Sequence, residues 1–271
     1  MSGKGLWFIP SARTIPVFWD FVSRVDFMDK LIVKNYQWDT AVNIARYFFF
    51  KQDYDYFIIC SDDVIGYPDH LKMLIQDTEE HGFPVISGWC NHIAHKASLS
   101  VEPIDEEVLK NGLEKPFPGL ALDDYNFVYV RDVATGRYGF PFIKAWFNGG
   151  PLLLLRRDAL KEVPFRGWRY CKDQYCVTPE AREKGRPVMG DVSFAIDCAK
   201  KDIPLMTDVR IFLYHVFGTR RRIKVGKKKT EISFVAAKND RRTKDEVDEA
   251  QALMVEAVHV AWNSGGEPIE V

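Results

Sequence analysis

The stretch YFIICSDDVIGYPDHL, residues 56–71, decides the predicted fold. An apolar run leads into two adjacent carboxylates, Asp62 and Asp63, and Pro68 then opens a helical pattern that Gly82 ends. A buried strand, a turn and a helix in this order form half of a βαβ unit. Two neighbouring carboxylates at the end of a buried strand repel each other, and burial adds to that cost. A bound cation or a run of backbone N–H groups would remove the difficulty.

The segments around this stretch repeat the alternation of strand and helix. Strands are expected at 5–10, 30–36, 83–89, 151–157 and 203–215, and helices at 14–26, 40–50, 190–201 and 243–263. Thr14 and Asp39 are the expected N-caps of the first two helices. Residues 125–142 are expected to form two strands around the turn DVATG, a small antiparallel element. The pattern predicts an α/β fold in which helices flank a mainly parallel central sheet, with a further helix at the C-terminus.

Length, composition and charge narrow the class of protein. The chain has 271 residues, 46% of them hydrophobic, which suffices for one large domain or a domain with a subdomain. A formal net charge of −1 argues against a protein whose whole surface binds a polyanion, so no nucleic acid partner is expected. No apolar run approaches the roughly 18 residues of a membrane span, and the N-terminus lacks the pattern of a signal peptide. Five scattered cysteines fit a reducing compartment, so a cytoplasmic protein is expected.

Asp62 and Asp63 are the first candidates for chemistry. Ligands of parallel α/β sheets gather at the carboxyl ends of the strands, and both aspartates follow such an end. Mn²⁺ and Mg²⁺ take oxygen ligands, and in proteins they commonly join one or two carboxylates to substrate phosphates. The alternative is structural, with one aspartate capping the following turn and the other solvated.

The segment SDDVIGYPDHL (61–71) resembles the metal-binding segment of family 2 glycosyltransferases with the A-type (GT-A) fold. Four more segments resemble landmarks of that family in the same order, within about residues 5–217: LWFIPSART, NIARYFF, WFNGGPLLLLRRDALKEV and GDVSFAIDCAKKDIPL. The resemblance implies a metal-dependent glycosyltransferase. Its donor would be a nucleoside-diphosphate sugar, by default a UDP-sugar, and its acceptor a hydroxyl of a carbohydrate, lipid-linked or protein substrate. The resemblance also implies a GT-A-like catalytic domain over 1–217, nucleotide-binding over about 1–90 and acceptor-binding over about 91–217.

The same resemblance assigns roles to individual residues. Asp63 and His215 would ligate Mn²⁺ or Mg²⁺, and Asp62 would contact the ribose or a metal-bound water. Asp191 would be the base that takes the acceptor's proton, which favours single displacement with inversion. The other residues expected at the nucleotide are Pro10, Ser11, Arg13, Asn35, Arg46 and Arg220. The residues expected at the acceptor are Trp146, Asn148, Gly149 and Gly150.

Several of these roles have structural alternatives. Asp191 can cap its helix, His215 can be a structural histidine, and Trp146 can belong to the core. The sequence also departs from the family, since Cys60 stands where an aspartate two positions before Asp62 is usual. The second strand lacks the aspartates that usually read the base, so the nucleotide is left open. Two rival functions remain: a sugar nucleotidyltransferase, and a non-catalytic protein of the same fold that binds a carbohydrate, nucleic acid or protein.

Residues 218–271 are expected to form a basic loop and a C-terminal helix packed on the domain. Seven of the ten residues from 220 to 229 are basic. They suit a solvated charge run, a loop that closes over the diphosphate, or a peripheral contact with anionic lipid. The helix has an apolar stripe and a largely acidic opposite face, so it would pack on the domain or on a second copy in a homodimer.

Overall fold

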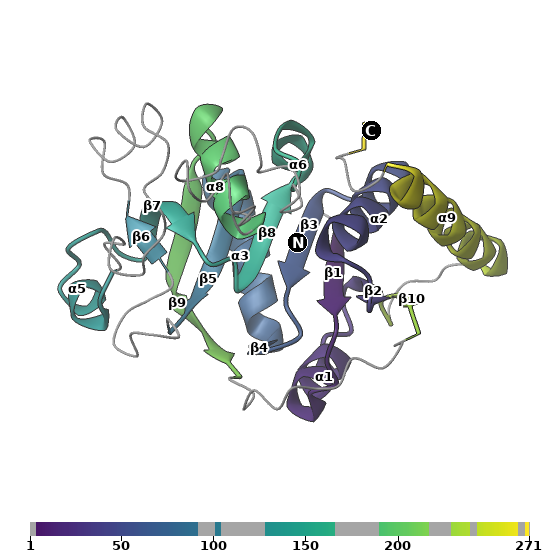
Figure 1. The fold of residues 1–271 in the computed structure, drawn as a ribbon. Coiled ribbons are helices and arrows are strands. Elements are labelled where there is room, and N and C mark those ends of the chain that lie inside the picture. Colours follow the sequence, from purple (N-terminus) through teal and green to yellow (C-terminus); the bar gives the residue numbers. More distant parts are fainter. Residues whose placement is uncertain are drawn as a thin grey trace, which may run out of the picture.

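A mixed sheet of ten strands runs through the described part of the computed structural model, which covers residues 4–91, 101–103, 128–165, 190–216, 229–238, 243–264 and 269–270 (Figure 1). The strands are β1 (Gly5–Ser11), β2 (Asp29–Lys34), β3 (Tyr56–Cys60), β4 (Val64–Ile65), β5 (Val85–Cys90), β6 (Val101–Pro103), β7 (Phe142–Asn148), β8 (Leu152–Arg156), β9 (Leu205–His215) and β10 (Glu231–Val235). Their order across the sheet is β10-β2-β1-β3-β8-β5-β9-β7-β6, and β4 pairs with the end of β9.

Five of the described strands, β1, β2, β3, β5 and β9, share one direction. β1 pairs in parallel with both β2 and β3, and β5 pairs in parallel with β9. β8 lies between β3 and β5 and is antiparallel to both, so β3 and β5 also run the same way. β10 at one edge and β7 and β6 at the other add antiparallel strands. The α/β fold, with a mostly parallel core and antiparallel additions, is thus confirmed, and five strands end on the same side of the sheet.

Helices cover both faces of the sheet. In the described part they are α1 (Pro16–Arg24), α2 (Trp38–Lys51), α3 (Pro68–His81), α5 (Val130–Ala134), α6 (Arg157–Glu162), α8 (Gly190–Lys200) and α9 (Lys244–Asn263). α1 and α3 pack their apolar side chains on one face, whereas α2, α6 and α8 contribute to the core on the other. None of the helices in the described ranges is long and apolar enough to cross a membrane.

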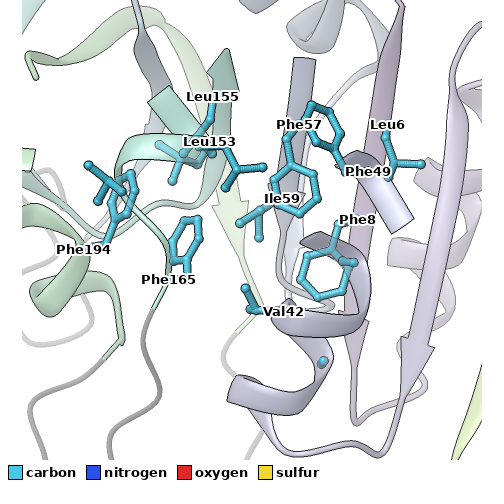
Figure 2. Close-up of a cluster of buried hydrophobic side chains, with 14 of the residues drawn as sticks. Leu6, Phe8, Val42, Phe49, Phe57, Ile59, Leu153, Leu155, Phe165 and Phe194 are labelled. Atoms are coloured by element: carbon cyan, nitrogen blue, oxygen red, sulfur yellow. The ribbon is translucent and has the colours of Figure 1, made fainter. Parts of the chain in front are cut away.

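Aromatic side chains hold β1 and β3 together beneath α2. Figure 2 shows Phe8, Phe49 and Phe57 in contact, with ring centroids 5.8 Å apart for Phe8–Phe57 and 5.3 Å apart for Phe49–Phe57. On β1, Leu6 and Phe8 face this core, while Trp7 and Ile9 face the core on the opposite side of the sheet. This explains why the strand is apolar throughout. The packing places the loops that follow β1 and β3 side by side.

α9 packs on α2, far from it in the sequence. Ala250, Ala257 and Ala261 are buried along one side of α9, and the Tyr47 hydroxyl on α2 donates a hydrogen bond to Glu256. The helix begins at Thr243, whose hydroxyl accepts from the N–H of Glu246. Small residues allow the two helices to approach closely.

The ends of three elements differ from the prediction. α1 starts with Ile15 as its N-cap, so Thr14 does not cap it. α2 starts at Trp38, which places Asp39 inside the helix and not at its N-cap. β2 stops at Lys34 because Asn35 has a left-handed backbone (φ 62°), a conformation that asparagine adopts more readily than most residues.

The predicted hairpin of residues 125–142 is wrong in its described part. Residues 130–134 form α5, and the carboxylate of Asp132 accepts a hydrogen bond from the N–H of Tyr129 at the start of that helix (3.0 Å). This local bond gives the backbone an alternative to strand pairing. A second difference is β10, which lies outside the predicted strands and pairs with β2 along its edge.

Candidate functional site

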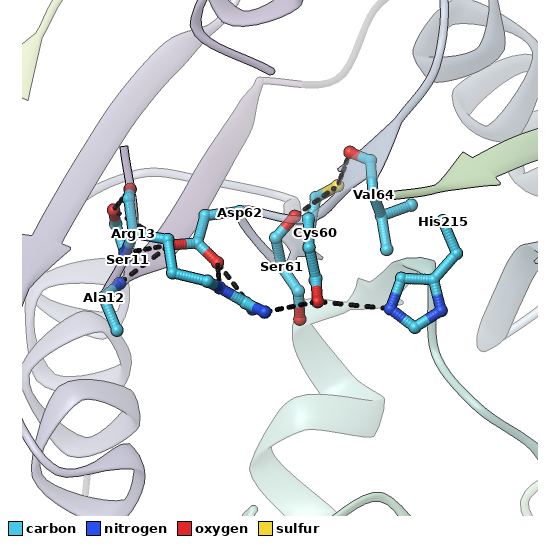
Figure 3. A network of polar contacts seen from close by, with 9 residues as sticks. Ser11, Ala12, Arg13, Cys60, Ser61, Asp62, Val64 and His215 are labelled. Atoms are coloured by element: carbon cyan, nitrogen blue, oxygen red, sulfur yellow. Dashed lines mark hydrogen bonds and ion pairs between the residues drawn. The ribbon is translucent and has the colours of Figure 1, made fainter. Parts of the chain in front are cut away.

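A cluster of charged side chains lies where β1, β3 and β9 end on the same side of the sheet (Figure 3). Asp62 and Asp63 follow β3, Arg13 lies in the loop that follows β1, and His215 is the last residue of β9. β1 and β3 are parallel neighbours, so their following loops meet. β4 turns back beside β9 and pairs Val64 with His215, which brings that histidine to Asp63.

Asp62 is buried and bound by donors from the loop after β1. Its Oδ2 accepts hydrogen bonds from the backbone N–H groups of Ala12 (2.8 Å) and Arg13 (2.6 Å), and from the Ser11 hydroxyl (3.3 Å). Its Oδ1 accepts from Nε of Arg13 at 2.9 Å. The side chain is 2% exposed, so this shell of donors replaces the water that a carboxylate needs. Asp62 therefore fixes the loop after β1 against the end of β3.

Arg13 joins the two aspartates. Its Nη2 lies 2.7 Å from Asp62 Oδ1, and its Nη1 lies 2.7 Å from Asp63 Oδ2. A planar guanidinium suits such a two-sided contact because its donors point in fixed directions. The side chain is nevertheless 45% exposed. The repulsion between the adjacent carboxylates is thus relieved by one arginine and by backbone N–H groups.

Asp63 and His215 form the second half of the cluster. His215 Nε2 lies 3.1 Å from Asp63 Oδ2, and the backbone N–H of Val216 donates to the Asp63 carbonyl at 2.7 Å. Hydrogen bonds with Asp63 and with Cys90 raise the pKa of His215 to about 9, against the opposing effect of burial. Burial raises the pKa of Asp63, but the hydrogen bond of His215 and the charge of Arg13 outweigh it and lower the pKa below its ordinary value. At neutral pH the pair is an imidazolium and a carboxylate.

Asp63 and His215 supply two of the ligand atoms that a divalent metal needs. Two adjacent ligands of an octahedral ion at about 2.1 Å lie about 3 Å from each other. The separation of 3.1 Å between Asp63 Oδ2 and His215 Nε2 matches that value, although it also matches their hydrogen bond. Within the described ranges no three His, Cys, Asp or Glu residues gather as a metal site. Asp63 and His215 are thus the residues that could hold a Mn²⁺ or Mg²⁺ once His215 has given up its proton, with water and phosphate as the remaining ligands.

The other residues expected at the nucleotide fall into two groups. Pro10 and Ser11 end β1 beside Asp62, and the Asn35 N–H donates to the Ser11 carbonyl (2.8 Å), so these three border the cluster. Arg46 lies elsewhere: it is 4% exposed and donates to the carbonyls of Ile269 and Lys161. Burial lowers the pKa of Arg46 to about 10. The structure therefore gives Arg46 contacts that stabilise the C-terminal segment, in place of a contact with the cluster.

The residues expected at the acceptor lie around the end of β7. Trp146 is 5% exposed and packs in the core, which is its structural alternative and leaves little of its ring for a sugar. Asn148 is buried, donates to Ser87 and Thr207, and accepts from the Gly150 N–H at 3.0 Å. Gly150 has a left-handed φ of 54°, as expected of a glycine in a tight turn, and Gly149 is exposed beside it.

Two predicted residues and the basic run lie wholly or partly outside the described residues. The backbone of Asp191 lies at the start of α8, but its side chain is outside them, as is Arg220. Of the basic run 220–229, only Lys229 is described, and its carbonyl accepts a hydrogen bond from the side-chain amide of Asn35 (2.8 Å).

The adjacent aspartates predict a bound cation or backbone N–H donors beside them, but the sequence does not indicate that Ala12 and Arg13 supply such donors or that Cys90 belongs to the cluster. Cys90 ends β5 and is hydrogen-bonded to His215, but its apolar surroundings favour a core residue. Backbone donors carry no side-chain signature at all, so only the pairing of β1 with β3 could reveal them.

A hollow among the described residues lies at the other end of β3. Its volume is about 940 Å³, and its wall includes Tyr56, Arg156, Arg157 and Lys161. Arg156 is paired with Asp158 at 2.8 Å, and Arg157 donates to three backbone carbonyls of residues 50–54. Both arginines are already engaged within the protein, so the charged cluster at the ends of β1, β3 and β9 is the better candidate for chemistry.

No protein-family model and no curated protein matches the chain. Among solved structures, A197 from STIV is similar to it, with 17% identity and a TM-score of 0.49 over 79% of this chain and 86% of that chain. CMP:2-keto-3-deoxy-manno-octonic acid synthetase complexed with CTP is similar with 11% identity and a TM-score of 0.39, over 93% of this chain and 99% of that chain. At this distance neither structure assigns a substrate to the chain.

Proposed function

We propose that the chain is a glycosyltransferase that transfers a sugar from a nucleoside-diphosphate donor, by default a UDP-sugar, to an acceptor hydroxyl. The observation that carries the proposal is the joined cluster of Asp62, Arg13, Asp63 and His215 where β1, β3 and β9 end. It combines anchored carboxylates with an exposed arginine, which suits a site for a charged diphosphate and its counter-ion.

The residues of the cluster have distinct roles in this proposal. Asp62 holds the loop after β1 through the N–H groups of Ala12 and Arg13, and the Arg13 side chain faces the nucleotide. Asp63 and His215 hold Mn²⁺ or Mg²⁺ when it is present. Such a metal supplies positive charge that stabilises the diphosphate as it leaves. Residues of about 1–90 supply this nucleotide side, and residues of about 91–217 supply the acceptor side.

Asp191 is the proposed base. The acceptor oxygen attacks the anomeric carbon and the bond from that carbon to the diphosphate oxygen breaks, while the proton of the acceptor hydroxyl passes to the Asp191 carboxylate. Attack opposite the leaving group inverts the configuration of the sugar. A carbohydrate, lipid-linked or protein acceptor suits this step, and a peripheral contact of residues 220–229 with anionic lipid would favour the lipid-linked class.

The test is a panel of nucleotide sugars with Mn²⁺ or Mg²⁺, scored by released nucleoside diphosphate and by transfer to added sugars. We expect one donor to react, and Asp63→Asn and Asp191→Asn to abolish the reaction. Asp158→Asn, which removes an exposed carboxylate at the start of α6, is the matched control and should react like the wild type. Full turnover by Asp191→Asn would exclude that residue as the base.

Two other functions are tested by the same panel. Nucleoside triphosphates, CTP included, are assayed with sugar phosphates and sugar acids, since pyrophosphate release would indicate nucleotidyl transfer. If no substrate reacts and no nucleotide raises the melting temperature, the chain is a binding protein of this fold.

A further inference from the structure

We infer that Arg13 is an internal counter-cation that must leave Asp63 before a divalent metal can bind there, so that metal and donor diphosphate bind together. The inference rests on the proposed function and concerns how its site is loaded. In the structure the Arg13 guanidinium lies 2.7 Å from Asp63 Oδ2, so the protein's own cation holds the place beside that carboxylate.

The competition arises at a single oxygen atom. Asp63 Oδ2 lies 3.1 Å from His215 Nε2, so it is the carboxylate oxygen best placed to share an ion with that nitrogen. The same atom lies 2.7 Å from Nη1 of Arg13. A divalent cation on this oxygen would lie within a few ångströms of the guanidinium, where two positive charges repel strongly. A metal alone must therefore displace the Arg13 guanidinium from Asp63, and it must also take the place of the Nε2 proton of His215.

Asp62 tolerates the departure of the guanidinium. After Arg13 swings away, the carboxylate of Asp62 keeps the N–H groups of residues 12 and 13 and the Ser11 hydroxyl, at 2.8, 2.6 and 3.3 Å. The backbone of Arg13 thus remains fixed while its side chain, 45% exposed, can turn outward. The movement is confined to one side chain and does not require the loop to open.

A diphosphate completes the exchange. It offers the guanidinium a new bidentate acceptor in place of the two aspartates, and it offers the metal further oxygen ligands. The diphosphate therefore lowers the cost of displacing Arg13, and the metal in turn frees Arg13 for the diphosphate. Thermodynamic linkage requires this effect to be mutual: each ligand raises the affinity of the other.

The experiment measures Mn²⁺ binding by the free-Mn²⁺ electron paramagnetic resonance signal, with and without UDP, after subtraction of the Mn²⁺ held by UDP alone. We expect weak binding of Mn²⁺ alone by the wild type and a decrease in its Kd of about tenfold or more with UDP. Arg13→Gln removes the charge and should bind Mn²⁺ alone about tenfold or more tightly than the wild type does. Arg13→Lys keeps the charge and should resemble the wild type, as should the control Arg24→Gln on the exposed side of α1.

Melting curves with and without Mn²⁺ provide a second readout that needs no substrate. Mn²⁺ alone should raise the melting temperature of Arg13→Gln more than that of the wild type. Equal Kd values of the wild type for Mn²⁺ with and without UDP would overturn the inference without any variant. Equal binding of Mn²⁺ alone by Arg13→Gln and the wild type would also overturn it, and either result leaves the proposed function intact. Absence of Mn²⁺ binding in every protein, even with UDP, would instead remove the metal site and the inference with it, and the donor panel would then decide the function.

Discussion

Replacement of His215 by glutamine should change how the stability of the metal-free protein depends on pH. The pKa of His215 is raised from 6.5 to about 9, first by the hydrogen bond with Asp63 and second by that with Cys90. At about 1.4 kcal/mol for each pKa unit, this difference corresponds to roughly 3 kcal/mol. Because the His215 side chain is 20% exposed and solvent screens the pair, about 2 kcal/mol is the better expectation.

The sign of this pH dependence follows from which protonation state of His215 stabilises the folded protein. A raised pKa in the folded protein means that the imidazolium stabilises it, fully below pH 6.5 and progressively less as the pH rises through about 9. The free energy of unfolding of the wild type should thus exceed that of His215→Gln by about 2 kcal/mol at low pH, and the excess should shrink toward zero near pH 10, by the same linkage. At the acid end, the lowered pKa of Asp63 means that stability falls as that carboxylate becomes protonated.

The assay is urea denaturation in the presence of a chelator, at about pH 6 and about pH 10, on either side of the titration. The measured quantity is the difference between wild type and variant, since lysines and tyrosines elsewhere titrate equally in both proteins. His259→Gln, on the exposed side of α9, is the control substitution. A difference between wild type and His215→Gln that is the same at both pH values would refute the charged pair.

Three further substitutions test the fold around the cluster and beyond it. Asp62→Asn should lower the free energy of unfolding, measured by urea denaturation, by about 2 kcal/mol because several donors lose a charged acceptor. The control Asp158→Asn should change it by less than about 0.5 kcal/mol. Equal effects of the two substitutions would contradict the buried network around Asp62. Gly82→Ala should lower stability by roughly 1 kcal/mol because its φ is +69°, with circular dichroism to confirm that the helix content is kept. Ala257→Leu should cost about 1–3 kcal/mol by overfilling the α2–α9 contact, while the same change at the exposed Ala252 should be nearly neutral in thermal melts.

The sequence predicts best what depends on neighbouring residues. The apolar run 56–60 forms β3, Pro68 opens α3, and Gly82 ends it with a left-handed backbone, as the pattern indicates. His215 ends its strand as expected because the apolar run IFLY leads directly into it. Local chemistry sufficed for these elements.

What the sequence could not show depends on contacts between distant segments. Nothing in the residues of β8 indicates that it lies antiparallel between β3 and β5, because this order is set by packing across the whole sheet. Arg13 and Asp62 are 49 residues apart, and their contact requires β1 and β3 to be neighbours. The roles of Asp191 and Arg220 stay predictions. α5 is a local difference: residues 130–134 form a helix where the sequence pattern indicates strands, and the side chain of Asp132 accepts a hydrogen bond from the N–H of Tyr129 at its start.

The position of β8 has a consequence for any attempt to divide the chain. In a fragment that ends at residue 90, β5 would lack both neighbours, because β8 and β9 come later in the chain. Its two unpaired edges and the apolar side chains of Val85 and Ile86 would be exposed, which favours aggregation. Residues 1–90 are therefore not an autonomous folding unit. Fragments 1–90 and 91–271 would have to fold upon each other, so co-expression of the two pieces should recover soluble protein where the first piece alone does not.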